Sequence, residues 1–369
     1  MGRSGTWLAY QAPSLHMRLG IFIYFSSHGE LRIGSHRYAD YLSWGEHIIH
    51  KSNKEFCCMT NPNSVSLISP LRYPGSKRRL VGYIEQAILL NDLKPKLFIE
   101  PFVGGASVAL QLMQDDLVEK VILMDIDPLV ASFWRTVFFD TDWLIEQIET
   151  IDVTLENWYW FKEFVPETTR QYALKCLFIN RTSFSGIMEG RAGPLGGRQQ
   201  LSEYKIDCRF PRETLIKRVR QAAIHKDRIL AIWDCSWDEG LQRIREKQRI
   251  GSLPDKNLFF YMDPPFFEKA DALYRFHFQQ QDHFELRNFL LKLRDSWILS
   301  YDAAPHVETL YGDAIKSGTN GTKKHNVELI YSTGIMTGRK PTKEVIISNL
   351  NDLPSETRFW KTASGILGK

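Results

Sequence analysis

The chain has 369 residues, of which 43% are hydrophobic, 24% charged and 12% aromatic, and this composition excludes a disordered polymer, a coiled coil and a collagen. The formal net charge is only +4, which excludes a uniformly basic coat that would hold nucleic acid by charge alone. The five cysteines form no CxxC pair and no Cys/His ligand spacing, which predicts reduced thiols in a cytosolic protein without a disulfide framework or a zinc site. The longest early apolar run, 21–25, is far shorter than the roughly 20 residues of a membrane span, so no membrane partner is expected.

Residues 1–68 differ from the rest of the chain, because they show weak periodicity and no clear helix caps. A polar segment that starts at Met59 is typical of the start of an ordered domain. We therefore expect 1–58 to be either a poorly ordered extension or an upstream translation artefact, and the ordered protein to begin near residue 69.

From residue 70 the pattern becomes that of an ordered α/β protein. A loop rich in Pro and Gly at 73–77 precedes an amphipathic stretch over 79–90. An apolar run at 96–100, bounded by prolines, predicts a buried strand, and a glycine turn then leads into a helix over 107–113. A second apolar strand follows at 121–124. This order is the beginning of a doubly wound sheet.

The middle of the chain has a different character. Residues 130–180 are predicted to form helices rich in Trp and Phe. Residues 181–249 contain fifteen Lys and Arg against nine Asp and Glu, a net charge of +6 that exceeds the total of the whole protein. By itself, such an excess of positive charge indicates only a solvated helical face.

The sheet resumes after residue 256. Asp282 with Glu285 resembles a capping box that opens a helix over 284–293. Further strands are predicted at 258–262, 297–300, 328–333 and 344–348, the last two paired as a terminal antiparallel hairpin.

The first segment that carries chemistry is the glycine turn after the strand at 96–100. Gly104 and Gly105 allow the backbone to approach a ligand closely, and Glu100 at the strand end suits a cationic or hydroxyl-rich group. The turn is not GxGxxG, which argues against a nicotinamide site. A plain tight turn remains the alternative.

The second segment is the end of the next strand, where Asp125 follows Gly105 by 20 residues. An acid at this separation is placed to accept the hydroxyl groups of a ribose. A strand-end Asp is otherwise commonly a helix N-cap. Together the two segments favour a cofactor that contains a nucleoside.

The third segment, Asp263-Pro264-Pro265-Phe266, follows the apolar strand at 258–262. Two consecutive prolines fix an extended backbone, which aims the Asp263 carboxylate and a proline carbonyl into the crevice at the strand ends. These two acceptors match the two N–H groups of an exocyclic amine. Phe266 offers a face on which a planar base can stack, an interaction of roughly 1–3 kcal/mol.

With these segments in order, the chain resembles the Dam-like family of DNA adenine N6-methyltransferases over about residues 70 to 350. In the family's α ordering the glycine loop comes first, the basic segment second and the Asp-Pro-Pro segment third, and this chain has the same order. The segments that carry the resemblance are Arg72–Lys77, Glu100–Gly105, Asp125, Asn180-Arg181-Thr182-Ser183-Phe184-Ser185-Gly186 and Asp263–Phe266.

The resemblance implies a Rossmann-like methyltransferase sheet with a terminal antiparallel hairpin and an inserted, mostly helical target-recognition domain. The catalytic domain is expected at 69–140 and 251–350, and the recognition domain at 141–250. The reaction implied is transfer of a methyl group to N6 of an adenine that is flipped out of duplex DNA.

The resemblance also implies S-adenosylmethionine as the cofactor, double-stranded DNA as the partner and no metal. A cognate restriction endonuclease that acts separately is a further partner that it leaves open. The catalytic residues implied are Asp263, Pro264, Pro265 and Phe266. The cofactor-binding residues implied are Tyr73, Gly75, Lys77, Glu100, Phe102, Gly104, Gly105, Asp125 and Asp263. Candidates for DNA contact are Arg181, Arg191 and Arg198, because Arg bonds bidentately to guanine and also holds phosphates.

The chain departs from the family pattern at two positions. Phe266 replaces the usual tyrosine, which keeps a stacking face and loses a hydroxyl, and Ser185 replaces the usual asparagine, so the target sequence is not carried over. Two alternatives stay open. One is methylation of cytosine N4 at a related amine, against which Asp263 speaks because serine is the usual residue there. The other is a non-catalytic relative that keeps the fold and acts as a DNA-binding or regulatory protein.

Overall fold

In the computed structural model the chain divides into two units, residues 1–64 and 65–369, and each is described by itself. The described parts are the backbone of 21–25 and 31–35, and residues 67–73, 75–188, 192–267, 275–276, 278–302, 305–329 and 342–355. In the first unit, strands β1 (Ile21–Phe25) and β2 (Leu31–Ser35) form an antiparallel pair. The rest of the predicted extension up to residue 66 lies outside the described residues, and its expected lack of order stays a prediction.

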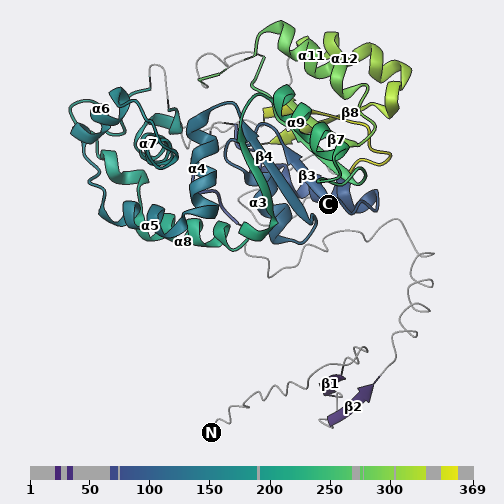
Figure 1. Ribbon diagram of the computed structural model, residues 1–369, viewed down its shortest axis with the longest axis horizontal. Helices are drawn as coiled ribbons and strands as arrows, with labels where there is room; N and C mark the ends of the chain where they lie inside the picture. Colours follow the sequence, from purple (N-terminus) through teal and green to yellow (C-terminus); the bar gives the residue numbers. More distant parts are fainter. Residues whose placement is uncertain are drawn as a thin grey trace. The chain divides into compact units, whose positions relative to one another are not determined.

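The second unit is built on a seven-stranded sheet (Figure 1). Its strand order is β5-β4-β3-β6-β7-β9-β8, in which the first five strands are parallel and β9 runs antiparallel to both of its neighbours. The strands are β3 (Leu97–Glu100), β4 (Lys120–Asp125), β5 (Ile229–Asp234), β6 (Leu258–Met262), β7 (Ser296–Asp302), β8 (Lys323–Leu329) and β9 (Thr342–Ser348).

Helices connect the strands and cover the sheet (Figure 1). The α-helices are α2 (Val81–Leu90), α3 (Ser107–Gln114), α4 (Pro128–Phe139), α5 (Thr141–Thr150), α6 (Leu155–Glu163), α7 (Thr169–Thr182), α8 (Arg212–Ala223), α9 (Trp237–Arg249), α11 (Gln280–Leu290) and α12 (Pro305–Ser317). Short 3-10 helices are η1 (Lys77–Arg79), η2 (Phe184–Gly186), η3 (Ile206–Arg209), η4 (Lys226–Arg228) and η5 (Thr319–Gly321). Helices α5 to α8 gather beyond α4, at one side of the sheet (Figure 1).

The central strands are continuous apolar runs because both faces of the sheet are buried. In β3, Phe98 packs into the core that includes residues of α2, α3 and α4. Leu97 and Ile99 point the opposite way, into the core that includes residues of α9, α11 and α12. The period of two along each strand thus divides one apolar run between two hydrophobic cores.

The predicted α/β fold, with its Rossmann-like sheet and terminal antiparallel hairpin, is confirmed. The hairpin forms between β8 and β9, and the predicted strand residues 330–333 lie outside the described part of the chain. The predicted capping box of Asp282 with Glu285 is wrong. Helix α11 begins one turn earlier, where Gln279 is the N-cap and Asp282 accepts a hydrogen bond from the Gln279 backbone N–H at 2.6 Å.

Strand β5 lies within 141–250, the range predicted for the recognition domain, yet it forms the edge of the catalytic sheet beside β4. Its residues, ILAIWD, are a short apolar run inside the basic 181–249 segment, and the expectation of a recognition domain over 141–250 left no place for a strand of the catalytic sheet there. Helices α5 to α8 do lie between β4 and β5 in the chain, as the mostly helical insert requires. The domain boundaries themselves stay a prediction.

The sheet has a topological switch point between β3 and β6. From β3 the chain proceeds outward to β4 and β5, and it returns to β6 and β7 on the other side. In open α/β sheets the crevice at the carboxyl ends of the strands beside such a point is where ligands bind. Glu100 ends β3 and Asp263 directly follows β6, so both of these acids lie at this edge.

Candidate active site

A pocket at this edge brings together residues that are far apart in the sequence. All nine residues predicted to bind a cofactor line it, together with Pro265, while Pro264 and Phe266 are not among the lining residues. The predicted residues in the lining are Tyr73, Gly75, Lys77, Glu100, Phe102, Gly104, Gly105, Asp125 and Asp263. The fold thus collects the three chemical segments into one cavity, although their roles in it stay predictions.

The glycine turn is packed against the ring of Tyr73. Gly104 has a φ of +41°, and a Cβ atom built on it would lie 2.6 Å from Cε1 of Tyr73. The Trp134 indole N–H donates to the carbonyl of Gly104 at 2.8 Å, which holds the turn from the opposite side. Only glycine fits here, both because φ is positive and because a side chain would collide with the ring.

The two acids after β4 have separate functions in the structure. Asp127 is the N-cap of α4 and accepts a hydrogen bond from the Leu129 backbone N–H at 2.9 Å. Asp125 lines the pocket and accepts from the backbone N–H groups of Gly104, at 2.9 Å, and Asp127, at 3.0 Å. The helix-cap alternative therefore applies to Asp127, although both acids line the pocket. Burial, and next the charge of Asp127, raise the pKa of Asp125 to about 7.

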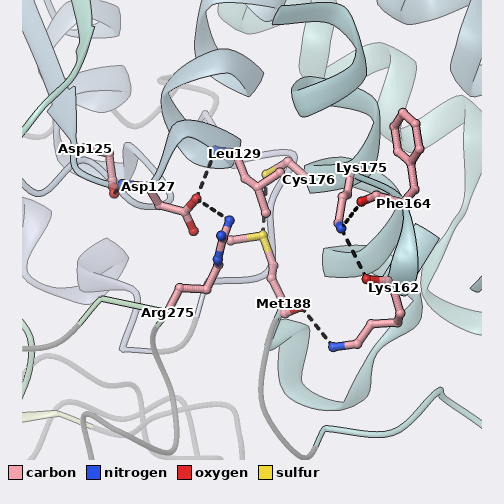
Figure 2. Close-up of polar contacts among 9 residues, drawn as sticks. All are labelled: Asp125, Asp127, Leu129, Lys162, Phe164, Lys175, Cys176, Met188 and Arg275. Atoms are coloured by element: carbon pink, nitrogen blue, oxygen red, sulfur yellow. Dashed lines mark hydrogen bonds and ion pairs between the residues drawn. The ribbon is translucent and has the colours of Figure 1, made fainter. Parts of the chain in front are cut away.

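Arg275 contributes a positive charge to the same wall, and no sequence signal pointed to it. Its guanidinium donates to Oδ1 of Asp127 at 3.1 Å, as Figure 2 shows. Two further lining residues were also missed, Trp237 at the start of α9 and Phe278, whose ring meets that of Phe102 edge-on with centroids 5.5 Å apart. Aromatic walls of this kind suit a planar base.

Glu100 is a buried carboxyl at the end of β3. It accepts a hydrogen bond from the Ala109 backbone N–H, at 3.1 Å, in the first turn of α3. Burial is the main reason that its pKa lies well above the usual range, and the charges of Asp263 and Asp125 add to the shift. The pocket is thus lined by several acids, among them Glu100, Asp125 and Asp263, which suits a ligand that is cationic or rich in hydroxyl groups.

Asp263 is held by a short polar network. The Lys77 ammonium lies 2.7 Å from its Oδ1, and the Ser300 hydroxyl on β7 donates to the same oxygen at 2.8 Å. The hydroxyl of Tyr261 lies 2.9 Å from that of Ser300 and extends the network into β6. Both contacts fall on Oδ1, so the carboxylate is oriented by one oxygen and offers the other to the pocket.

Lys77 connects this network to two more residues. Its side chain is only 5% exposed, and its ammonium lies 3.8 Å from Glu344 on β9 and 5.3 Å from the centre of the Phe266 ring. Burial raises the pKa of Glu344 to about 8, although the ammonium of Lys77 opposes the shift. Sequence reasoning missed Glu344, because it reaches the site only through the pairing of β9 beside β7. Lys77 lies over the Phe266 ring, which links that ring to the Asp263 network.

The Asn-Arg-x-x-Phe-Ser-Gly segment forms a clamp on the loop that carries Tyr73. The side chain of Asn180 accepts from the Arg72 backbone N–H at 2.8 Å and donates to the Arg72 carbonyl at 3.0 Å and the Gly186 carbonyl at 2.9 Å. Gly186 has a φ of +77°, and a Cβ there would lie 2.0 Å from the Arg72 carbonyl oxygen. Ser185, the departure from the family asparagine, also lies in the left-handed region, with φ 56° and ψ 9°.

The end of this segment is anchored in the helices, as Figure 2 shows. The Met188 sulfur lies 3.5 Å from Sγ of Cys176, and the Lys162 ammonium donates to the Met188 carbonyl at 3.2 Å. Lys175 in turn donates to the carbonyls of Lys162 and Phe164. Met188 is therefore anchored to α6 and α7.

The three arginines predicted to contact DNA have different positions. Arg198 is exposed in the turn after Pro194. Arg181 is only 4% exposed at the end of α7, which a sequence pattern could not show. Arg191 lies outside the described residues. The basic segment also has structural functions, since Arg212 donates to carbonyls that end α5 and Arg228 to carbonyls around α3.

Within the described ranges, no group of three or more His, Cys, Asp or Glu could hold a metal ion. A helix long and apolar enough to cross a membrane was also not found among the residues described. The described cysteines, Cys176, Cys208 and Cys235, are free thiols as predicted, and Cys57 and Cys58 lie outside the described part.

Comparison with known proteins gives an independent result. Residues 73–192 match the family model of D12 class N6 adenine-specific DNA methyltransferases. The chain is 36% identical over 84 residues to the type II methyltransferase M.MjaIII of Methanocaldococcus jannaschii, a match that covers 22% of this chain and 29% of that relative.

Two solved structures share a distant likeness to the chain. A candidate RNA methyltransferase of Pyrococcus horikoshii is 11% identical, with a TM-score of 0.33 over 75% of this chain and 84% of the other. The precorrin 8W decarboxylase of Methanobacterium thermoautotrophicum is 10% identical, with a TM-score of 0.31 over 75% and 91%. These values are too low to indicate a shared activity.

Proposed function

Through residues 73–192 the chain belongs to the D12 class of N6 adenine-specific DNA methyltransferases, and from this premise we propose that it methylates N6 of adenine in double-stranded DNA with S-adenosylmethionine as the methyl donor. The curated relative is matched over only 29% of its length, so the activity of the whole protein rests on the site rather than on that relative. A restriction endonuclease that acts separately is part of the same proposal.

The position of Asp263 is the observation that carries the proposal. Its carboxylate lies at the carboxyl end of β6, lines the pocket and is oriented through Oδ1 by Lys77 and Ser300. Oδ2 and a proline carbonyl of the same segment would then accept the two N–H groups of the target amine, which directs the nitrogen lone pair away from the ring plane. The same carboxylate is placed to hold the proton that the methylated amine releases, and catalysis would come mainly from alignment of the reacting groups.

The pocket residues fit S-adenosylmethionine by their chemistry. That group supplies a methyl bound to a sulfonium, a leaving group that needs no metal. Asp125 would accept ribose hydroxyls, and the closely packed turn of Gly104 and Gly105 would let the backbone approach the methionine end beside Glu100. Phe102, Trp237 and Phe278 would cover the adenine ring of the cofactor and exclude water from it.

Duplex DNA would meet the surface around Phe184 and the turn at 195–200. Phe184 is 66% exposed there, an apolar side chain of the kind that fills the space left by an unstacked base. Arg198 is exposed nearby in sequence and would contact phosphate or a base edge. Extrusion of the adenine costs a few kcal/mol, which these contacts would offset.

Incubation of the protein with labelled S-adenosylmethionine and mixed-sequence duplex DNA, followed by digestion to nucleosides, tests the proposal. We expect label in N6-methyl-2′-deoxyadenosine and none with Asp263→Asn, which keeps the shape of the side chain beside Lys77. Label in N4-methylcytosine would replace the adenine assignment with the cytosine alternative. Absence of label, together with tight DNA binding, would identify a non-catalytic relative.

A further inference from the structure

Four arginines lie on segments that pack against one another beside the loop of Tyr73. Arg72 lies in the loop before η1, Arg181 at the end of α7, Arg209 in η3 and Arg218 on α8. The clamp of Asn180 on Arg72 brings the first two together, and the guanidinium of Arg218 donates to the Ser69 carbonyl at 3.3 Å, three residues before Arg72. We name these four residues the arginine cluster.

Positive charges act on three of the four guanidinium groups. Burial, and then the charges of Arg218, Arg72 and Arg209, lower the pKa of Arg181 to about 9. Burial and Arg209 lower the pKa of Arg72, and burial and Arg78 lower that of Arg218. Each of these guanidinium groups therefore feels positive neighbours more strongly than negative ones.

The cluster lacks the carboxylates that normally accompany buried arginines. Among the described residues, no Asp or Glu forms an ion pair with any of the four. Nε of Arg181, whose residue is 4% exposed, and Nη1 of Arg72 are buried without a hydrogen-bond acceptor. Other arginines of this protein are paired, as Arg170 is with Asp140 and Arg249 with Glu246.

A buried charge without a partner is strongly unfavourable, so a cluster of this kind is expected to be completed by an anion. Its members grade from buried Arg181, through half-buried Arg72 and Arg218, to exposed Arg209, which leaves an approach from solvent. Guanidinium groups bind phosphate oxygens in a bidentate manner. We propose that the arginine cluster is a phosphate site that holds one phosphodiester of the substrate DNA.

The place of the cluster indicates which phosphodiester this is, on the premise that the proposed function is correct. Arg72 directly precedes Tyr73, and Lys77 of the same loop contacts the Asp263 carboxylate. A phosphate held by Arg72 and Arg181 therefore lies close to the nucleotide whose base enters the pocket. The arginine cluster would fix the sugar–phosphate backbone of the DNA at the point about which the target nucleotide rotates.

Arg209→Gln combined with Arg218→Gln tests this inference, because neither side chain is buried and Arg181 stays in place. The matched control is Arg243→Gln with Arg249→Gln, which removes the same charge from α9 in the same basic segment. Binding of a labelled mixed-sequence duplex is measured by fluorescence anisotropy over a series of salt concentrations. S-adenosylmethionine binding is measured separately by calorimetry.

We expect the cluster variant to bind DNA at least tenfold more weakly, and the slope of log affinity against log salt to fall by about 0.9 for each phosphate that the variant no longer neutralises. Cofactor affinity should stay within twofold, and the control should keep the wild-type salt slope. An unchanged slope in the cluster variant would overturn the inference. Stabilisation of the wild type by inorganic phosphate alone, with DNA affinity unaffected in the variant, would overturn it as well, because the site would then serve a free anion. Failure of the wild type to bind any duplex would instead refute the proposed function.

Discussion

Replacement of Asn180 by alanine tests the clamp that joins the recognition segment to the cofactor loop. The side chain is 0% exposed, and Asn180→Ala leaves three backbone groups without their hydrogen-bond partner: the Arg72 N–H, the Arg72 carbonyl and the Gly186 carbonyl. Each stranded buried group costs about 1–3 kcal/mol. Because water can reach part of the Arg72 backbone, we take the lower end for each and expect a loss of about 3 kcal/mol in the free energy of unfolding.

Asn91→Ala is the matched control, since Asn91 also makes three hydrogen bonds, to Ala87 and Asp352, but at a partly exposed position. Water replaces those partners, so we expect a loss below about 1 kcal/mol. Urea unfolding followed by tryptophan fluorescence measures both variants, and calorimetry measures cofactor affinity, which should fall at least tenfold only in Asn180→Ala. Equal losses of stability in the two variants would refute the reasoning, because the clamp would then contribute no more than a surface amide.

Three further changes have outcomes that the structure specifies. Gly104→Ala places a Cβ 2.6 Å from the Tyr73 ring at a positive φ, so cofactor affinity measured by calorimetry should fall at least tenfold. The control is Gly82→Ala, whose Cβ meets nothing within 4 Å, and this variant should bind the cofactor normally. Equal cofactor binding by the two variants would show that the turn tolerates a side chain. Ser185→Asn should raise the free energy of unfolding by roughly 0.5 kcal/mol in urea titrations, because Asn adopts the left-handed region of φ 56° more readily than Ser, and a decrease would contradict this account. The pKa of Asp125, raised to about 7 by burial, means that its contribution to stability is present at low pH and is lost as pH rises through about 7. Ribose hydroxyls favour the ionised form of Asp125, so cofactor affinity should increase from pH 6 to pH 8, and binding should release a proton. Calorimetry in buffers of different ionisation enthalpy measures this proton release, which should be absent in Asp125→Asn. Cofactor binding by the wild type without proton release would contradict this assignment of Asp125.

The sequence alone located most of the strands and the acids and glycines at their ends. Buried parallel strands are apolar runs bounded by turn residues, so β3, β4, β6 and β7 were evident from local pattern. The carboxyl ends of such strands share one edge, which is why Glu100, Asp125 and Asp263 could be assigned to one site before their contacts were known. Strand β5 was missed although it too is an apolar run, because it lies inside the basic segment that was expected to recognise DNA.

The tertiary structure decided what no local pattern contains. The placement of β9 between β7 and β8 brings Glu344 to Lys77, and the return of the chain after β6 brings Arg275 to Asp127. It also decided that Arg181 is buried among other arginines rather than exposed in a basic stripe. The net charge of +4 and the +6 segment describe how many charges the chain carries, whereas long-range pairing of elements determines which of them have partners. Side-chain chemistry and its order along the chain are local properties, but the burial and partners of a charge depend on residues more than a hundred positions away.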